Sequence, residues 1–297
     1  MPPRMDKFDP TGSGRPGMTR PHPYQGRQAA LATKHGKLAQ IAPALRSAPG
    51  LDIVVADIDT DQFGTFTGEV PRPGDTLETA IIKARAGAEA LGLPLGIASE
   101  GSFGPHPELV LVPGNLEIVV LVDTELGYHV AEQVLTTDTN FAHIRLTPDQ
   151  PPDDFAYNAG FPTHGLVVQP SSGPGPVFKG IVDSTDLAAG IATSAAASAD
   201  GKALVQTDMR ACYNPTRQIQ ITAAAERLAE RLTTLCPACA TPGWGMVGSA
   251  SGLPCEICQT PTALTRSTIY GCPACTYRES HIVQELAPAG RCPICNP

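Results

Sequence analysis

Length, composition and charge set the first limits on this chain. Its 297 residues, 42% hydrophobic and 17% charged, are enough for a full core plus a smaller second module. The formal net charge of −8 argues against a general binder of nucleic-acid backbones, which needs a basic face. No apolar stretch reaches the roughly 18 residues of a membrane span, and the first 27 residues lack the apolar region of a secretory signal. We therefore expect a cytoplasmic protein.

The N-terminal part combines a tail with a strand–turn–helix unit. Residues 1–27 are rich in Pro and Gly and mildly basic, which predicts a disordered tail. The sequence QAALAT (28–33) predicts a strand that runs into a turn containing Thr33, His35, Gly36 and Lys37. A turn between a strand and a helix start presents backbone N–H groups and the helix dipole to an anion, although most such turns bind nothing. The helix that follows carries Leu38, Ile41 and Leu45.

Two acidic segments follow the next predicted strands. The strand LDIVVADI (51–58) ends among Asp57, Asp59 and Asp61, and the loop after it contains Glu69. Residues 75–91 then predict an amphipathic helix, whose apolar stripe consists of Leu77, Ile81, Ala84, Ala88 and Leu91.

The capping residues of this helix and the strand after it locate the candidate active site. Asp75 with Glu78 has the pattern of a capping box, and Gly92 closes the helix. The strand 94–99 delivers Glu100 into a loop of small residues, 101–104. Because such a loop leaves room for a ligand and a strand-end carboxylate can hold a metal, we expect the active site around Glu100.

The remaining patterns continue an alternation of strands and helices. A hairpin is predicted over residues 116–137 with its turn at 125–127, and further strands at 141–146, 164–170, 177–182 and 202–207. Helices are predicted near 152–157 and over 184–197, and Asn214-Pro215 marks the start of a last helix. That helix is predicted to bury Ile221, Ala225, Leu228, Leu232 and Leu235. Residues 28–232 therefore form an α/β body with a mixed sheet.

Eight of the nine cysteines form four CxxC pairs in the last quarter of the chain: Cys236/Cys239, Cys255/Cys258, Cys272/Cys275 and Cys292/Cys295. Four thiolates from two such knuckles are the usual tetrahedral set for Zn²⁺. Residues 233–297 thus predict a double zinc-ribbon module with two structural zinc sites. Consecutive pairing of the knuckles and a cross-braced or nested pairing are chemically equally acceptable.

The stretch ETAIIKARAGAEALGLPLGIASEGS resembles the signature of the inosine-triphosphate-pyrophosphatase-like superfamily, and ATKHGK resembles the phosphate loop that precedes it there. The likeness covers residues 29–107 and implies a body of that fold. It also implies a Mg²⁺- or Mn²⁺-dependent nucleotide pyrophosphatase or phosphohydrolase that acts on a non-standard or modified nucleotide. The whole chain further resembles an uncharacterised bacterial family with C-terminal cysteine knuckles, through ASEGSFGPHP, DMRACYNPTR and CPICNP.

The superfamily likeness assigns roles to particular residues. Glu100 and Glu78 would be magnesium ligands or orient the water, and Lys37, Lys83 and Arg85 would contact phosphates. Thr33, His35, Gly36 and Ser102 would line the substrate site, with Arg210 and Arg217 as cationic contacts to a phosphate or base. The chain departs from the superfamily in having one acid, Glu100, where a pair is usual, and in lacking its Ser-His-Arg stretch.

Simpler interpretations remain for several of these residues. Glu78 can be only the capping-box acid, and Lys83 and Arg85 can be solvated helix residues. The alternative function is a non-catalytic scaffold that binds a nucleotide or RNA while the ribbons contact a partner or a second copy. Residues 233–297 carry three arginines and three glutamates, and this balance favours a structural or oligomerising ribbon over nucleic-acid contact.

Overall fold

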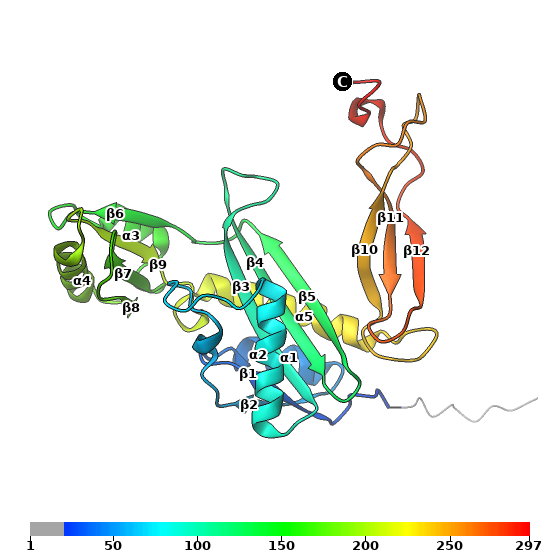
Figure 1. The fold of residues 1–297 in the computed structure, drawn as a ribbon, viewed down its shortest axis with the longest axis horizontal. Helices are drawn as coiled ribbons and strands as arrows, with labels where there is room; N and C mark the ends of the chain where they lie inside the picture. Colours follow the sequence, from blue (N-terminus) through cyan, green and yellow to red (C-terminus); the bar gives the residue numbers. More distant parts are fainter. Residues whose placement is uncertain (1–20) are drawn as a thin grey trace, which may run out of the picture.

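The computed structural model describes residues 21–297, which form two β-sheets with their helices and a projecting C-terminal arm (Figure 1). The first sheet has the strand order β2-β1-β3-β4-β5. Strands β1 and β2 and strands β1 and β3 are parallel, whereas β3, β4 and β5 are antiparallel. The predicted α/β body with a mixed sheet is thereby confirmed. The strands are β1 (Gln28–Ala32), β2 (Asp52–Ala56), β3 (Leu95–Pro105), β4 (Pro113–Asp123) and β5 (Tyr128–Thr136).

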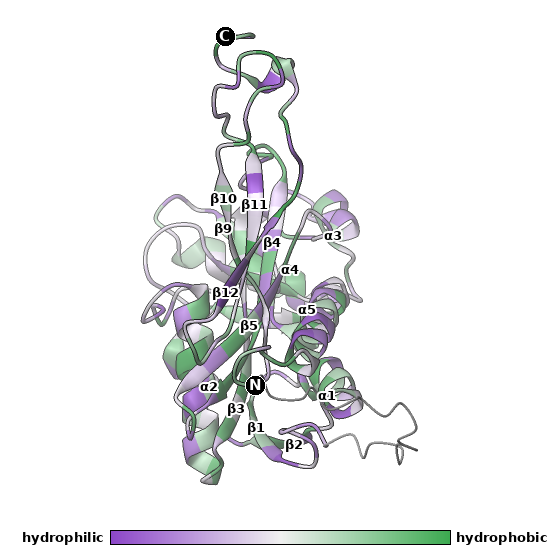
Figure 2. Ribbon diagram, turned by 90° about the vertical axis from the view of Figure 1, so that its right-hand side faces the viewer, coloured by the Kyte–Doolittle hydropathy of each residue, from purple (hydrophilic) through white to green (hydrophobic). Residues whose placement is uncertain are grey.

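Helices cover both faces of this sheet. Helices α1 (Leu38–Ser47) and α5 (Pro215–Thr233) pack against each other on one face, and α2 (Thr76–Leu91) lies on the other. The strand side chains alternate accordingly. Leu31 and Ile97 join the core under α1 and α5, whereas Ala32 and Ala98 face α2. In Figure 2 these strands are mostly hydrophobic, while α5 turns a polar face outward.

Small residues let α2 lie very close to the sheet. A Cβ atom added to Gly96 on β3 would lie 2.0 Å from the carbonyl oxygen of Ala84 on α2. A Cβ on Gly87 would lie 3.0 Å from the Ala32 methyl. This close approach fixes where the side chains of α2 meet those of β3.

A second, antiparallel sheet follows in the chain and has its own core. The sequence predicted one mixed sheet and did not indicate this second one. Its strand order is β6-β9-β7-β8, and its cluster of buried residues is separate from that of the first sheet. The elements are β6 (His143–Leu146), α3 (Asp153–Ala159), β7 (Leu166–Pro170), β8 (Phe178–Ile181), α4 (Ser184–Ala197) and β9 (Ala203–Thr207). Short 3₁₀ helices lie at η1 (Thr60–Phe63) and η2 (Ala211–Tyr213).

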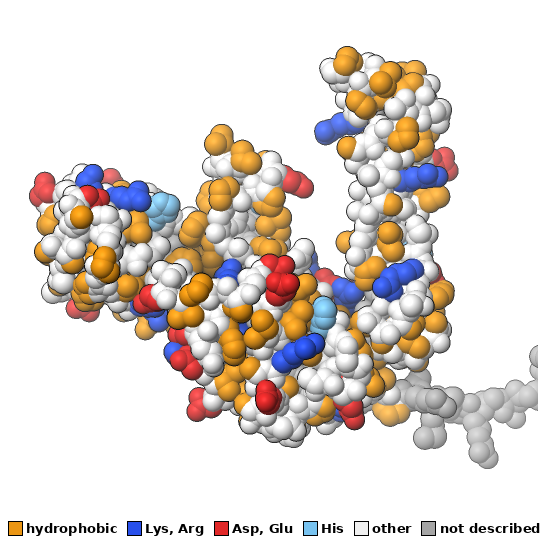
Figure 3. All heavy atoms as spheres, in the orientation of Figure 1, with side chains coloured by type: hydrophobic (Ala, Val, Ile, Leu, Met, Phe, Trp, Pro, Cys, Tyr) orange, Lys and Arg blue, Asp and Glu red, His pale blue; other side chains and the backbone are white. Residues whose placement is uncertain are grey.

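The C-terminal arm is a three-stranded antiparallel sheet in the order β10-β11-β12, which extends away from the body (Figure 1). It comprises β10 (Gly245–Ser251), β11 (Thr265–Gly271), β12 (Arg278–Ile282) and the 3₁₀ helix η3 (Ala289–Arg291). The connection between β3 and β4 also projects from the body, and its tip, 109–112, exposes four apolar side chains (Figure 3).

Three local predictions need correction. The predicted disordered tail covers residues 1–27, of which residues 1–20 lie outside the described part. The remainder is ordered around Tyr24, which is buried and whose hydroxyl donates to Asp123 over 3.2 Å. The predicted loop 101–104 is strand, because β3 stays paired with β4 up to Pro105. Leu235 is 39% exposed because α5 ends at Thr233. None of the helices in residues 21–297 is long and apolar enough to cross a membrane.

Candidate functional site

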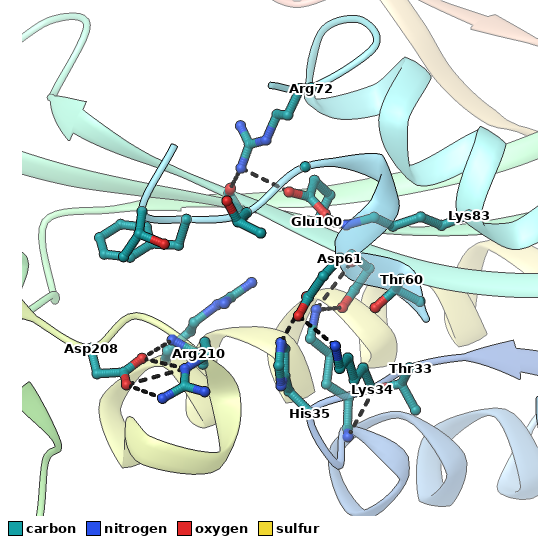
Figure 4. A pocket seen from close by; sticks show the side chains of 18 of the residues that line it. Thr33, Lys34, His35, Thr60, Asp61, Arg72, Lys83, Glu100, Asp208 and Arg210 are labelled. Atoms are coloured by element: carbon teal, nitrogen blue, oxygen red, sulfur yellow. Dashed lines mark hydrogen bonds and ion pairs between the residues drawn. The ribbon is translucent and has the colours of Figure 1, made fainter. Parts of the chain in front are cut away.

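A cavity of about 210 Å³ lies at the carboxyl end of β1, between the two sheets (Figure 4). After β1 the chain crosses one face of the sheet through α1 and enters β2, which lies on one side of β1. It then crosses the opposite face through α2 and enters β3, which lies on the other side of β1. Open sheets commonly bind ligands at such a switch point, in the crevice outside the carboxyl ends of the strands. The location is therefore one that the topology itself favours for a ligand.

The lining of the cavity is strongly cationic, although the whole chain carries a net charge of −8. Three carboxylates face seven lysine and arginine side chains, which are Lys34, Lys37, Arg72, Lys83, Lys179, Arg210 and Arg217. A concave site whose lining carries an excess of one sign of charge attracts ions of the opposite sign. The cavity is thus suited to an anion.

Lys37 lies between the turn after β1 and the start of α1. Its Nζ atom donates to the Ser99 hydroxyl over 2.8 Å and to the Ser99 carbonyl over 3.1 Å. The nearby carboxylates are engaged elsewhere, and Lys37 forms no ion pair within the part of the chain that the structure describes. Burial, followed by the charge of Arg217, lowers the pKa of Lys37 to about 8. An anion beside this ammonium group would therefore be stabilised.

Glu100 lies on β3, next to the Ser99 that Lys37 contacts, and is only 8% exposed. Its two carboxylate oxygens pair with Arg72 and with Lys83, each over 2.7 Å. Burial alone would raise the pKa of Glu100, but Lys83, Lys37 and Arg72 together hold this pKa below its usual value. The carboxylate is consequently ionised at neutral pH.

Two further arginines enter from the segment between β9 and α5. Arg210 pairs with the buried Asp208 over 2.5 Å, and Arg217 pairs with the buried Glu117 over 3.0 Å. The bare backbone at Gly101 permits the second pair, because a Cβ there would lie 2.6 Å from Glu117 and 2.7 Å from Arg217. Both guanidinium groups are thus held in place by fully buried acids.

Acidic side chains tie the turn after β1 to the start of η1. Lys34 pairs with Asp59 over 2.8 Å. Asp61 lies 2.8 Å from Lys34 and 3.1 Å from His35 (Figure 4). Burial lowers the pKa of His35 even though Asp61 opposes this effect. The imidazole is therefore mainly neutral at neutral pH.

The structure brings most of the predicted site residues together and leaves some outside. Seven line the cavity: Thr33, His35, Lys37, Lys83, Glu100, Arg210 and Arg217. Gly36 and Ser102 lie beside lining residues without lining the cavity themselves. Glu78 completes the capping box of α2 with Asp75, and Arg85 lies by a different surface hollow with Glu89. The simpler interpretation of Glu78 and Arg85 thus agrees with their positions.

Several lining residues had no role in the prediction: Phe66, Arg72, Ser99, Phe103 and Lys179. Arg72 and Phe66 belong to the loop between η1 and α2, and Lys179 comes from β8 in the second sheet. A local sequence pattern gives no signal for Lys179, because the second sheet brings it to the cavity. The Pro- and Gly-rich loop around Arg72 could have drawn attention as a candidate binding loop.

The eight paired cysteines form two groups with cross-braced pairing. Cys236 and Cys239 meet Cys272 and Cys275 at the base of the arm, and the other group comprises Cys255, Cys258, Cys292 and Cys295. The closest sulfur pairs are 3.6 Å and 3.5 Å apart, too long for disulfides. Zinc–sulfur bonds of about 2.3 Å in a tetrahedron place the sulfurs about 3.8 Å apart. Both groups therefore fit a zinc ion.

Thr241 and Thr260 occupy equivalent places, two residues after the second cysteine of their knuckles. Hydrogen bonding to these threonines lowers the pKa of Cys239 and of Cys258 to about 6. The residues between, Ala240 and Gln259, both have positive φ, which gives the two knuckles the same turn. This likeness supports metal-ligand thiolates in both groups. Within residues 21–297 no further group of three or more metal-ligating side chains is found.

Comparison with known proteins places the chain in a family. A search of curated proteins found no match. Residues 83–297 match the family model described as "Domain of unknown function (DUF6671)". The match includes Lys83, Glu100, Arg210, Arg217 and all eight paired cysteines, whereas Arg72 lies before it. Because it covers more than half of the chain, the protein belongs to this DUF6671 family.

Proposed function

We propose that the cavity binds a nucleotide through its phosphates and hydrolyses a phosphoanhydride bond in it. The ammonium group of Lys37 carries this proposal, because it is bonded to Ser99 and has no carboxylate partner within residues 21–297. Lys37 is half-buried, and a cation withdrawn from water without a counter-ion is costly unless a ligand supplies the negative charge. Arg210 and Lys83, in the same cavity, are placed to share that charge.

The resemblance of residues 29–107 to inosine-triphosphate-pyrophosphatase-like enzymes supports a triphosphate as the ligand and a non-standard or modified nucleotide as its class. In such chemistry Glu100 would either orient the attacking water or hold the metal ion, and Lys37 with the turn after β1 would hold the phosphates. Arg210 would neutralise the charge that develops on the leaving group.

A Mg²⁺ or Mn²⁺ ion would enter with the substrate, neutralising phosphate charge and polarising the bond that breaks. Magnesium at such sites is commonly held by one or two carboxylates together with substrate phosphates. Glu100 and Asp61, which both line the cavity, are the carboxylates that fit this requirement.

The test is release of phosphate and pyrophosphate from a panel of canonical and deaminated nucleoside triphosphates, with Mg²⁺ or Mn²⁺. We expect turnover by the wild type that falls at least 100-fold in Glu100→Gln. Glu89→Gln, an exposed glutamate of α2 outside the cavity, is the matched control and should retain the wild-type rate. Absence of turnover with every nucleotide, in a chain that is folded and binds nucleotide, would contradict hydrolysis.

One observation favours a second candidate, a scaffold that binds a nucleotide without hydrolysing it. Both oxygens of Glu100 already accept from cations, Arg72 and Lys83, so the carboxylate must exchange a partner before it can orient water or bind a metal. Calorimetric binding of a nucleoside triphosphate, with no product after prolonged incubation with Mg²⁺, would support the scaffold.

A further inference from the structure

Three phenylalanines from separate segments meet beside the cationic lining of the cavity. Phe66 comes from the loop between η1 and α2, Phe103 from β3, and Phe141 from the segment before β6. The ring centroids of Phe66 and Phe103 are 5.9 Å apart at 86°, and those of Phe103 and Phe141 are also 5.9 Å apart. The chain has only eight phenylalanines, so three of them in one cluster is a marked concentration.

This aromatic cluster is not part of a core. All three side chains are half-buried, and they do not belong to any of the four hydrophobic clusters found in residues 21–297. Phe66 and Phe103 line the cavity, and Phe141 lies behind them. Aromatic surface that is exposed to water inside a polar cavity costs free energy. This free energy is recovered when an apolar ring covers the surface.

The loop that carries Phe66 is held in shape by its own hydrogen bonds. Within the segment 65–70, which we call the strap, the Thr65 amide donates to the Val70 carbonyl over 3.0 Å, and the Val70 amide donates to the Thr65 hydroxyl over 3.0 Å. Glu69 forms an ion pair with Lys179 of the second sheet. The strap thus presents Phe66 to the cavity from a fixed position.

Cations lie next to the rings. The guanidinium carbon of Arg217 is 5.2 Å from the centroid of Phe103. Arg72, just after the strap, pairs with Glu100 and donates to the Gly101 carbonyl, beside Phe103 on the same strand. Because Lys37 and Arg210 line the same cavity as Phe66 and Phe103, one ligand with an anionic part and a flat apolar part could contact both.

We propose that Phe66 and Phe103 form the subsite for the aromatic ring of the ligand, so that the cavity selects a nucleotide over a phosphate compound without a ring. This inference rests on the proposed function for the phosphate end. Stacking of a base on an aromatic side chain changes affinity by about 5- to 150-fold when the side chain is removed.

The experiment is calorimetric binding of ATP and of inorganic triphosphate to the full chain, without divalent metal so that neither is hydrolysed. Triphosphate carries no less phosphate charge than ATP, so tighter binding of ATP isolates the ring. We expect wild type to bind ATP at least 10-fold more tightly than triphosphate. Phe66→Leu should lose this advantage and leave the triphosphate affinity unchanged, whereas Phe66→Trp should keep it.

Controls separate this subsite from the proposed function. Tyr157→Leu removes an aromatic side chain that is 84% exposed on α3 and should change neither affinity. Phe103→Leu repeats the test from β3, independently of the folding of the strap. Equal wild-type affinities for ATP and triphosphate, or an equal loss of both in Phe66→Leu, would overturn the ring subsite while phosphate binding stands. Binding of neither ligand would overturn the ring subsite, whereas the proposed function is decided by turnover in the nucleotide panel with Mg²⁺ or Mn²⁺.

Discussion

Lys37 connects the chemistry of the cavity to pH. Its pKa is lowered to about 8, first by burial and then by the charge of Arg217, while Glu117 and Glu100 oppose the shift. A bound anion raises this pKa, because the opposite charge stabilises the ammonium form. Below pH 8 the free protein already carries the proton, but above pH 8 binding must first take one up. We therefore predict that nucleotide affinity falls as pH rises above 8, by up to about tenfold per pH unit.

The measurement is the affinity for ATP between pH 6.5 and 9.5, again without divalent metal. Lys37→Arg keeps a cation that stays charged over this range, so it should flatten the decline above pH 8. The ligand and His35 titrate in both the wild type and Lys37→Arg, so their contributions drop out when the two pH profiles are compared. Lys37→Met should bind about 10- to 100-fold more weakly at pH 7. An unchanged pH profile in Lys37→Arg would show that another group is responsible.

The residues of the cavity that the sequence predicted are those carried by short, local patterns. Lys37 and Thr33 belong to a strand–turn–helix unit, and Glu100 lies on a strand whose buried start, 94–99, is recognisable in the sequence. Phe66 and Lys179 could not be found in this way. Phe66 comes from a loop whose position depends on its own hydrogen bonds, and Lys179 comes from the second sheet, 110 residues after its partner Glu69 in the chain.

At the scale of elements, the contact between α2 and β3 positions Lys83 and Glu100. Gly96 allows this contact, because a Cβ there would lie 2.0 Å from the Ala84 carbonyl oxygen. We predict that Gly96→Ala lowers the free energy of unfolding by about 1–3 kcal/mol, since α2 must move away from the sheet. The movement would also separate Lys83 from Glu100. Urea unfolding and ATP affinity measure the two effects.

Gly104→Ala is the matched control, because it lies on the same strand and an added Cβ there has no neighbour within 4 Å. It should change the free energy of unfolding by less than about 0.5 kcal/mol. Equal stability of the two variants would mean that the helix does not depend on this close approach.

Elements were predictable where one periodicity runs through a single segment, as in α2, α4 and the hairpin of β4 and β5. Their partners were not predictable. The apolar pattern of β7 is the same whether the strand joins the first sheet or a new one, and only pairing with β9 decides it. Likewise, the spacing of the knuckles predicts a metal site but not that the first knuckle meets the third.

For the whole molecule, the two cysteine groups differ in whether they contact the body. The group of Cys239 lies at the base of the arm, where Trp244 packs with Cys236 and Cys272. A Cβ on Gly243 would lie 2.5 Å from Val130 on β5, so this base rests directly on the body. The group of Cys258 includes Cys295, two residues before the C-terminus, which lies at the far end of the arm (Figure 1). Metal at the base should therefore affect the body, and metal at the far end should not.

We predict two zinc ions per chain by elemental analysis, and one in either Cys239→Ser or Cys258→Ser. These cysteines occupy equivalent knuckle positions, so the substitutions match. Trp244 is the single tryptophan and reports only the base of the arm. Cys239→Ser should shift its fluorescence and lower the unfolding temperature of the body, whereas Cys258→Ser should leave both unchanged. Equal fluorescence shifts in the two variants would contradict independent sites, since metal loss at the far end would then have to reach Trp244 through β10 and β11.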